Sequence, residues 1–144
     1  MKKEVIELLI KQGVLRIRQK DTERIKSLII SAEIDATAAK KIQLTEETAN
    51  LIFRGIYEPI RQLGDAWWWL TGYEPADHQT SLESLKDLNI NEKIRLNFLD
   101  RFRKIRNDSN YRGMRVSVAQ VKEILDFWNA CGKEIIKQLL EQTK

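Results

Sequence analysis

The chain has 144 residues and a formal net charge of +4, with 42% hydrophobic and 32% charged residues. These values are typical of one soluble domain that is large enough to bury a continuous core. A single cysteine excludes an internal disulfide, and one cysteine with one histidine cannot supply the four ligands of a structural zinc site. No apolar run reaches the length of a signal peptide or a membrane span, so we expect a cytoplasmic protein without membrane contact, metal or cofactor.

The first half of the chain is expected to be helical, because six Gly and two Pro leave little turn material for a many-stranded fold. Residues 4–17 have the apolar pattern of a short helix that is broken or ended near Gly13, so residues 1–20 are assigned to an extra N-terminal helix. Asp21 is expected to cap a second helix that runs to about Ile42. Its apolar face contains Ile25, Leu28, Ile29, Ala32 and Ala36.

A third helix is expected to begin at Thr45, with Glu46 and Glu47 in its first turn, where carboxylates complement exposed amide groups. Pro59 predicts a kink or a new segment inside this helix, and Gly72 predicts its end together with Pro75. Its apolar positions advance by three and four residues, as in a helix packed lengthwise against neighbours. They are Phe53, Ile56, Ile60, Leu63, Trp67 and Leu70.

The run Trp67–Trp69 lies near the end of this third helix. Three consecutive helical residues point in directions about 100° apart, so they cannot form one base-stacking platform. The spacing assigns Trp67 to the core, and we expect Trp68 or Trp69 to cover a second helix or the partner in a homodimer.

The second half of the chain predicts three further helices. Residues 80–83 read as a capping box for a short helix that runs to about Leu88. Asn91 is expected to cap the next helix, which ends near Gly113 and carries Ile94, Phe98, Phe102 and Ile105 inward. A second capping box at residues 117–120 begins the last helix. The prediction is an all-α antiparallel bundle of five or six helices that forms a single domain over residues 1–144.

The segment from Lys93 to Arg115 holds eight Lys or Arg against two Asp, an excess larger than the net charge of the whole chain. Helical spacing places Arg103 and Asn107 on one polar stripe, with Arg106 beside it; Asp100 and Asn110 extend the stripe. A guanidinium group offers five donors in a plane that matches phosphate oxygens, so RNA or a nucleotide is the natural partner. The alternative is an ordinary solvated helix face.

Two other features have alternative interpretations. Arg54, Glu58, Arg61 and Asp65 step along the third helix as a charge ladder, which is either a surface feature or a means of orienting Arg106. His78 lies in a polar loop, where a histidine is usually solvated or bonded to a helix cap. It is also the only side chain that titrates near neutrality without help, so it is a candidate general base.

Three sequence features together suggest a family. They are the long helix pair with Tyr57-Glu58 followed by Leu63 and residues 67–70, the stretch from Gly72 to His78 before a helix, and the motif from Arg106-Asn107 to Tyr111. With these features, the segment from about Glu23 to Leu140 resembles the HEPN (higher eukaryotes and prokaryotes nucleotide-binding) superfamily of helical bundles. Many members are metal-independent endoribonucleases that act as dimers around a shared cleft, often as toxins paired with a nucleotidyltransferase antitoxin.

The resemblance implies a catalytic set of Arg106, Asn107 and Tyr111, in which the arginine holds the scissile phosphate. Tyr111 occupies the position of the family's histidine; a phenol, with a usual pKa of about 10, is a poor general base at neutral pH but can donate a hydrogen bond to phosphate. In some systems the partner transferase adds AMP to a tyrosine near this motif, which makes Tyr111 a candidate acceptor. The remaining site residues are assigned to phosphate or RNA binding (Arg101, Arg103, Asn110 and Arg112) and to accessory roles (Glu58 and His78).

The sequence thus predicts a protein that binds RNA or a nucleotide at a dimer cleft, either as an endoribonuclease or as its degenerate relative. The alternative is a non-catalytic helical module that binds a partner protein such as a nucleotidyltransferase.

Overall fold

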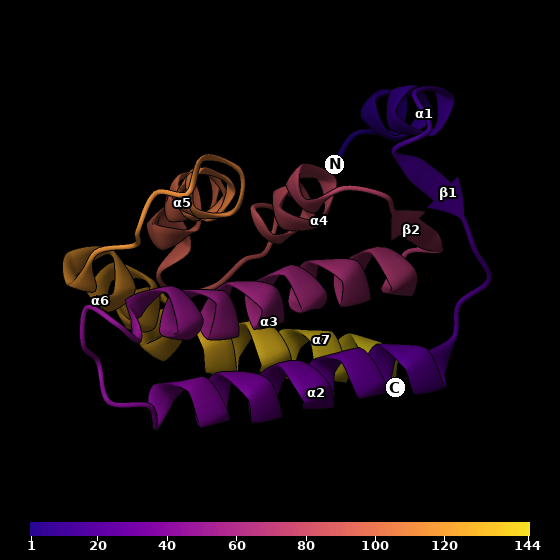
Figure 1. Ribbon diagram of the computed structural model, residues 1–144. Helices are drawn as coiled ribbons and strands as arrows, with labels where there is room; N and C mark the ends of the chain where they lie inside the picture. Colours follow the sequence, from indigo (N-terminus) through magenta and orange to yellow (C-terminus); the bar gives the residue numbers. More distant parts are fainter.

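The computed structural model describes residues 1–144 and confirms a helical bundle (Figure 1). Its elements are α1 (Lys3–Lys11), β1 (Leu15–Ile17), α2 (Thr22–Lys40), α3 (Ala49–Leu70), β2 (Tyr73–Pro75), α4 (His78–Leu85), a 3₁₀ helix (Lys93–Phe98), α5 (Leu99–Arg112), α6 (Val118–Phe127), a π-helical turn (Trp128–Gly132) and α7 (Lys133–Thr143). Because α6, the π turn and α7 follow one another without a break, the bundle consists of six helical rods. None of them combines the length and the apolar character needed to cross a membrane.

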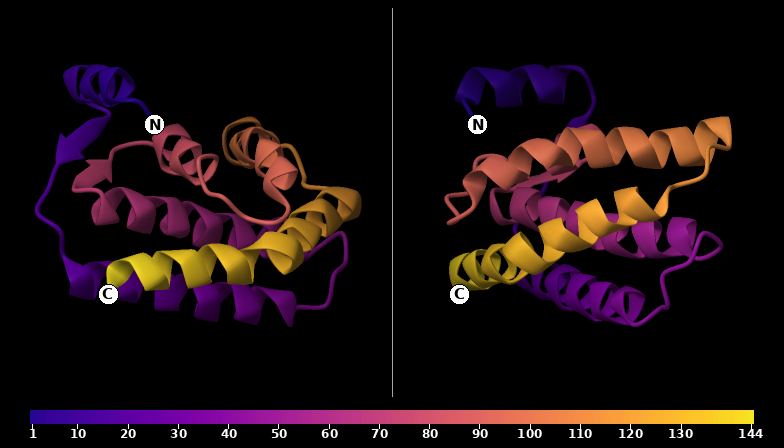
Figure 2. Two further views of the ribbon diagram at one scale, coloured as in Figure 1. Left: turned by 180° about the vertical axis from the view of Figure 1, so that it is seen from behind. Right: turned by 90° about the vertical axis from the view of Figure 1, so that its left-hand side faces the viewer.

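Helix α3 is the central element of the bundle. It packs against α2 and α7 on one side and against α4 and α5 on the other, as the views in Figures 1 and 2 show. The α2–α3 hairpin is antiparallel, and α7 lies along both of its helices. One continuous hydrophobic core joins these helices, and Phe53, Tyr57 and Phe102 are among its fully buried side chains.

The predicted start of α2 is confirmed, whereas that of α3 is wrong. The Asp21 side chain accepts a hydrogen bond from the Arg24 backbone N–H at 3.1 Å, as expected of an N-cap. Helix α3 begins at Ala49, four residues after Thr45. The Thr45 and Thr48 hydroxyls instead each accept a backbone N–H from the other residue, and this pair closes a turn before the helix.

The tryptophan run is arranged differently from the prediction. Trp67 is only partly buried, whereas Trp68 is 0% exposed and Trp69 is 6% exposed. Trp68 covers a second helix, α4, where its Nε1 donates to the Thr80 carbonyl at 2.7 Å. Trp69 packs in the core, with the Arg24 guanidinium 4.5 Å from its ring centre. Of the two alternatives, a second helix or a dimer partner, Trp68 therefore meets the first.

Helices α4 and α5 also begin at other residues than predicted. Asp77 caps α4 by accepting the Thr80 backbone N–H at 2.7 Å, so the capping box at residues 80–83 does not form and His78 is the first helical residue. Before α5 the chain forms a 3₁₀ helix, without a cap from Asn91. In this tighter turn Ile94 and Phe98 are 78% and 45% exposed, contrary to the prediction.

The sequence correctly predicts where α5 ends and where α6 begins. Gly113 ends α5 in the left-handed region at φ 65°, which glycine adopts without steric cost. The capping box predicted at residues 117–120 is present, with the Ser117 hydroxyl accepting from the Gln120 N–H and the Gln120 side chain accepting from the Ser117 N–H.

The N-terminal segment contains a strand that the sequence did not predict. Helix α1 ends at Lys11, so the end predicted near Gly13 is confirmed, whereas residues 15–17 form a strand. Beyond the glycine, β1 pairs with β2 in antiparallel register, with Leu15 opposite Pro75 and Ile17 opposite Tyr73. The backbone N–H of Ala76 continues the contact by donating to the Val14 carbonyl at 2.9 Å. This pair fixes the chain immediately before α4.

Candidate functional site

A cavity of about 410 Å³ lies between α5 and the first turn of α4. Four of the predicted site residues line it from α5, namely Arg103, Arg106, Asn107 and Tyr111. His78 lines it from α4, together with Ala76, Asp77 and Gln79. The fold therefore brings the lone histidine to the basic segment, although 28 positions separate His78 from Arg106 in the sequence.

The position of His78 is fixed by contacts from α3. The Trp68 indole holds the Thr80 carbonyl, and the Ser84 hydroxyl reaches the Gly64 carbonyl at 3.4 Å. A Cβ at Gly64 would collide with the Ser81 carbonyl, so the absence of a side chain there permits the close approach of the two helices. The histidine is thus part of a rigid element, contrary to its prediction as a loop residue.

The Tyr57 hydroxyl and His78 Nδ1 lie 3.3 Å apart, and the tautomer of the ring decides which of them donates. Partial burial, together with the positive charges of Arg61 and Arg106, holds the pKa of His78 below its usual 6.5. The lowered pKa favours the neutral imidazole, in which one ring nitrogen carries no proton. Burial also raises the pKa of Tyr57 to about 12, so this phenol keeps its proton.

Arg106 is anchored to α3 through Glu58. Its Nε lies 3.4 Å from Glu58 Oε1, and its guanidinium carbon lies 5.7 Å from the centre of the Tyr57 ring. The other oxygen of Glu58 accepts from Arg61 Nε at 3.0 Å. Of the two alternatives for the charge ladder, the structure favours the one in which Glu58 faces the basic segment.

The ladder continues from Arg61 towards α4. Arg61 Nη1 donates to Asp65 Oδ2 at 2.9 Å, and the Ser81 hydroxyl donates to Asp65 Oδ1 at 2.5 Å. Burial raises the pKa of the Asp65 carboxyl, and the bonds from Ser81 and Arg61 partly offset this rise. Asp65 therefore ties α3 to α4 beneath the cavity and does not itself line it.

Two arginine donors in the cavity wall have no hydrogen-bond partner. The Nε atoms of Arg103 and Arg106 are buried and neither forms a hydrogen bond within the protein, although that of Arg106 lies 3.4 Å from Glu58 Oε1 in an ion pair. A buried donor without a partner costs roughly 1–3 kcal/mol, and more for a charged group, so such donors usually meet a ligand or water. The site thus places two guanidinium groups beside a neutral histidine, and only that of Arg106 has an ion-pair partner in the protein, Glu58.

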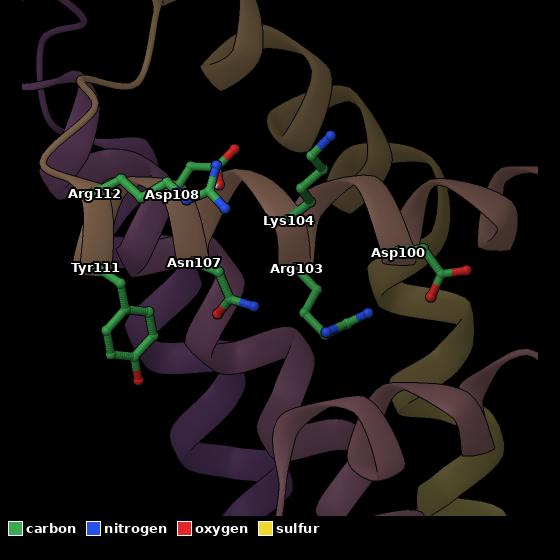
Figure 3. Close-up of a pocket in the computed structure, with 7 residues that line it drawn as sticks. All are labelled: Asp100, Arg103, Lys104, Asn107, Asp108, Tyr111 and Arg112. Atoms are coloured by element: carbon green, nitrogen blue, oxygen red, sulfur yellow. Dashed lines mark ion pairs between the residues drawn. The ribbon is translucent and has the colours of Figure 1, made fainter.

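A second cavity of about 590 Å³ lies along α5 next to the first, and Figure 3 shows its lining residues. The two cavities share Arg103, Asn107 and Tyr111. In Figure 3 these three side chains project from the same side of α5, whereas Lys104 projects from another. Tyr111 is 80% exposed, so its ring stands in solvent between the two cavities.

Three residues assigned to phosphate binding are not brought into the first cavity. Arg101 forms a two-pronged pair with Glu123 of α6, at 2.7 and 3.1 Å. Asn110 accepts a hydrogen bond from Arg54 of α3 at 2.7 Å. Arg112 lines only the second cavity, where it lies 3.9 Å from Asp108.

Tyr57 is the site residue that sequence reasoning missed, because its place in the apolar pattern of α3 hides its polar end. The neighbouring Glu58 was the available signal, since a buried phenol beside a carboxylate must find a polar partner.

Comparison with protein-family models finds no match to this chain, and comparisons with curated proteins and with solved structures find none either. Fold and site together define an α-helical bundle with a cavity lined by arginine and histidine.

Proposed function

We propose that the protein binds the phosphate groups of RNA or of a nucleotide in the cavity between α4 and α5. The observation that carries this proposal is the convergence of two guanidinium groups on the cavity that His78 lines: Arg103 forms no ion pair within the protein, and Arg106 pairs only with Glu58. Phosphate oxygens accept hydrogen bonds from guanidinium groups in a matching planar geometry, and the charge of the guanidinium strengthens each bond. The resemblance to HEPN domains implies the same kind of ligand.

The test uses two substitutions that remove the same charge from the same helix. Arg106→Ala deletes a cavity donor, whereas Arg101→Ala deletes an arginine that is paired with Glu123 outside the first cavity. We expect Arg106→Ala to weaken the binding of a labelled single-stranded RNA and to lower the slope of log affinity against log salt by about one phosphate contact. Arg101→Ala should change both much less. Equal effects of the two substitutions would refute a site in this cavity.

His78 provides an independent readout of phosphate binding. It is the only histidine, so the imidazole signals in an NMR titration belong to it without further assignment. A dianion bound between Arg106 and His78 stabilises the charged imidazole, so inorganic phosphate should raise the pKa of His78. The increase should persist in Arg101→Ala and disappear in Arg106→Ala.

RNA cleavage is a second candidate function, favoured by the neutral His78 in the same cavity. In this proposal the imidazole accepts the proton of a ribose 2′-hydroxyl, whose oxygen attacks the phosphorus while the bond to the 5′-oxygen breaks and this oxygen takes up a proton from water. The products are a 2′,3′-cyclic phosphate and a 5′-hydroxyl end. Tyr111 binds but does not act as the base, so His78→Gln should abolish cleavage while Tyr111→Phe retains it; the opposite order would exclude His78.

The competing function is a non-catalytic module that binds a partner protein such as a nucleotidyltransferase. Its surface would be found on α2 and α3, where Ile30, Ile34 and Leu51 are 56%, 61% and 60% exposed. Copurification of a stoichiometric partner that Ile34→Glu releases, with no RNA bound to the native protein, would favour this function. A homodimer through the same surface is tested by the oligomeric state of the same variant.

A further inference from the structure

The two cavities along α5 form one elongated polar surface, and Tyr111 lines both of them. Both contain Arg103, Asn107 and Tyr111, and their lining residues extend from Asp100 to Arg112 along the helix. Arg103 and Tyr111 alone are eight residues apart, which corresponds to about 12 Å at 1.5 Å per residue. A single phosphate held by Arg106 and His78 would fill only the first cavity and leave the second free.

The second cavity has cationic groups of its own. Lys104 forms no ion pair, and Arg112 has only the long contact of 3.9 Å with Asp108, in which its side chain is 75% exposed. The carboxylate of Asp100 is already occupied, since it accepts from Lys86 Nζ at 2.7 Å. These groups suit a second phosphate next to the first.

The Tyr111 ring has no structural task in the protein. It is 80% exposed, its hydroxyl forms no hydrogen bond, and no aromatic ring stacks on it. An aromatic face beside a basic groove is the arrangement on which proteins stack the unpaired bases of a single strand. Bases within a duplex are already stacked on each other and do not offer a free face.

We propose that this surface takes a single-stranded polynucleotide, with one phosphate in the His78 cavity, the next phosphate beside Lys104 and Arg112, and an unpaired base on the Tyr111 ring. The inference rests on the proposed phosphate site and adds the class of ligand: a single strand of at least two nucleotides, and not a mononucleotide or a duplex. Tyr111 is then a stacking residue, whose ring matters and whose hydroxyl does not.

The experiment compares Tyr111→Phe with Tyr111→Leu in fluorescence-anisotropy titrations of a labelled single-stranded oligonucleotide. Phe keeps the aromatic face and should bind within about two-fold of the native protein. Leu keeps an apolar side chain without the π face and should bind about five-fold or more weakly, as the loss of one stacked base predicts. Because the side chain is exposed, neither variant should alter folding, which circular dichroism checks.

Ligand length and strandedness complete the test. Lys104→Ala should weaken the oligonucleotide but leave a competing mononucleotide unaffected, and a duplex of the same sequence should bind more weakly than the single strand. The titrations are run with RNA and with DNA oligonucleotides, and the one whose affinity falls in Tyr111→Leu identifies the sugar of the ligand. If Tyr111→Leu lowers the affinity for neither, the inference is overturned. If Arg106→Ala weakens binding while Tyr111→Leu does not, this inference alone fails. If Arg106→Ala changes nothing, the proposed phosphate site fails as well.

Discussion

Two adjacent tryptophans should contribute very differently to the stability of the bundle. Trp68 is fully buried and donates from its indole to the Thr80 carbonyl at 2.7 Å. In Trp68→Phe the buried carbonyl loses its donor, which costs roughly 1–3 kcal/mol, and the smaller ring leaves a gap worth roughly 1–2 kcal/mol more. We therefore expect the free energy of unfolding to fall by about 2–4 kcal/mol, a large part of the 5–15 kcal/mol typical of a domain.

Trp67→Phe is the matched control, because it is the same substitution one position earlier. Trp67 is partly exposed, its indole N–H makes no hydrogen bond within the protein, and its main aromatic contact is the edge of the Trp68 ring at 5.4 Å. The expected loss is below about 1 kcal/mol. Both values come from urea unfolding followed by circular dichroism, with midpoints compared at constant slope.

The comparison can refute the arrangement of α4 on α3. If Trp67→Phe costs as much as Trp68→Phe, then Trp67 belongs to the core, as the spacing of apolar residues alone suggests. The hydrogen bond to Thr80 would then not hold α4. Because Thr80 lies in the first turn of α4, Trp68→Phe should also shift the NMR signals of His78, and Trp67→Phe should leave them in place.

Three further outcomes follow from burial and backbone geometry. At pH values between its lowered folded-state pKa and 6.5, His78 binds fewer protons in the folded protein than in the unfolded chain. The free energy of unfolding should therefore fall as the pH falls through this window. Urea unfolding at several pH values should show this dependence, and His78→Gln should remove it. Gly113 has a left-handed backbone with free space where a Cβ would lie, so Gly113→Ala should lower the free energy of unfolding by about 1 kcal/mol. Gly64→Ala should lower it more, because the added Cβ would meet the backbone of Ser81. Thermal unfolding compares the two variants, and the reverse order would contradict the α3–α4 packing. Burial raises the pKa of the Cys131 thiol to about 11, so a thiol reagent should react with it only on unfolding, and rapid labelling of the native protein would contradict its burial.

The sequence predicts those elements whose signals are local. The cap at Asp21, the capping box at Ser117 and the end of α5 at Gly113 depend on residues within one turn, and the structure confirms them. The apolar period correctly identifies the core positions Ile25 and Ile60. Helix type and core face are therefore accessible wherever one helix packs against one neighbouring layer.

The predictions from the sequence are wrong where a second layer of the fold also buries the helix or binds the strand. The C-terminal half of α3 is buried by α4 as well as by α2 and α7, so Gly64 and Trp68 form a second buried line that a one-sided pattern cannot include. The capping box predicted at residues 80–83 does not form, because the Asp77 side chain caps α4 three residues earlier. The strand β1 is too short to have a period, and its partner lies far along the chain.

The sequence likewise predicts one part of the candidate site and not the other. The charge count identifies the basic segment, and helical spacing correctly brings Arg103, Arg106 and Asn107 to one wall. The sequence does not reveal that His78 faces them, because this contact depends on the packing of α4 against α3 and α5. Nor does it reveal that Arg101 is occupied by Glu123, since a pair between two helices has no sequence spacing.

The pairing of β1 with β2 has a consequence for the order in which the protein assembles during its synthesis. The contact from Arg18 to Glu74 at the edge of this pair spans 56 residues, and at about 5–20 residues per second the ribosome needs roughly 3–11 s to make the intervening chain. During this interval β1 has no partner, while α2 and α3 emerge and can form their hairpin. The strand pair that fixes the approach to His78 can thus form only after α2 and α3 have been synthesised, and the cavity is completed only when α5 follows.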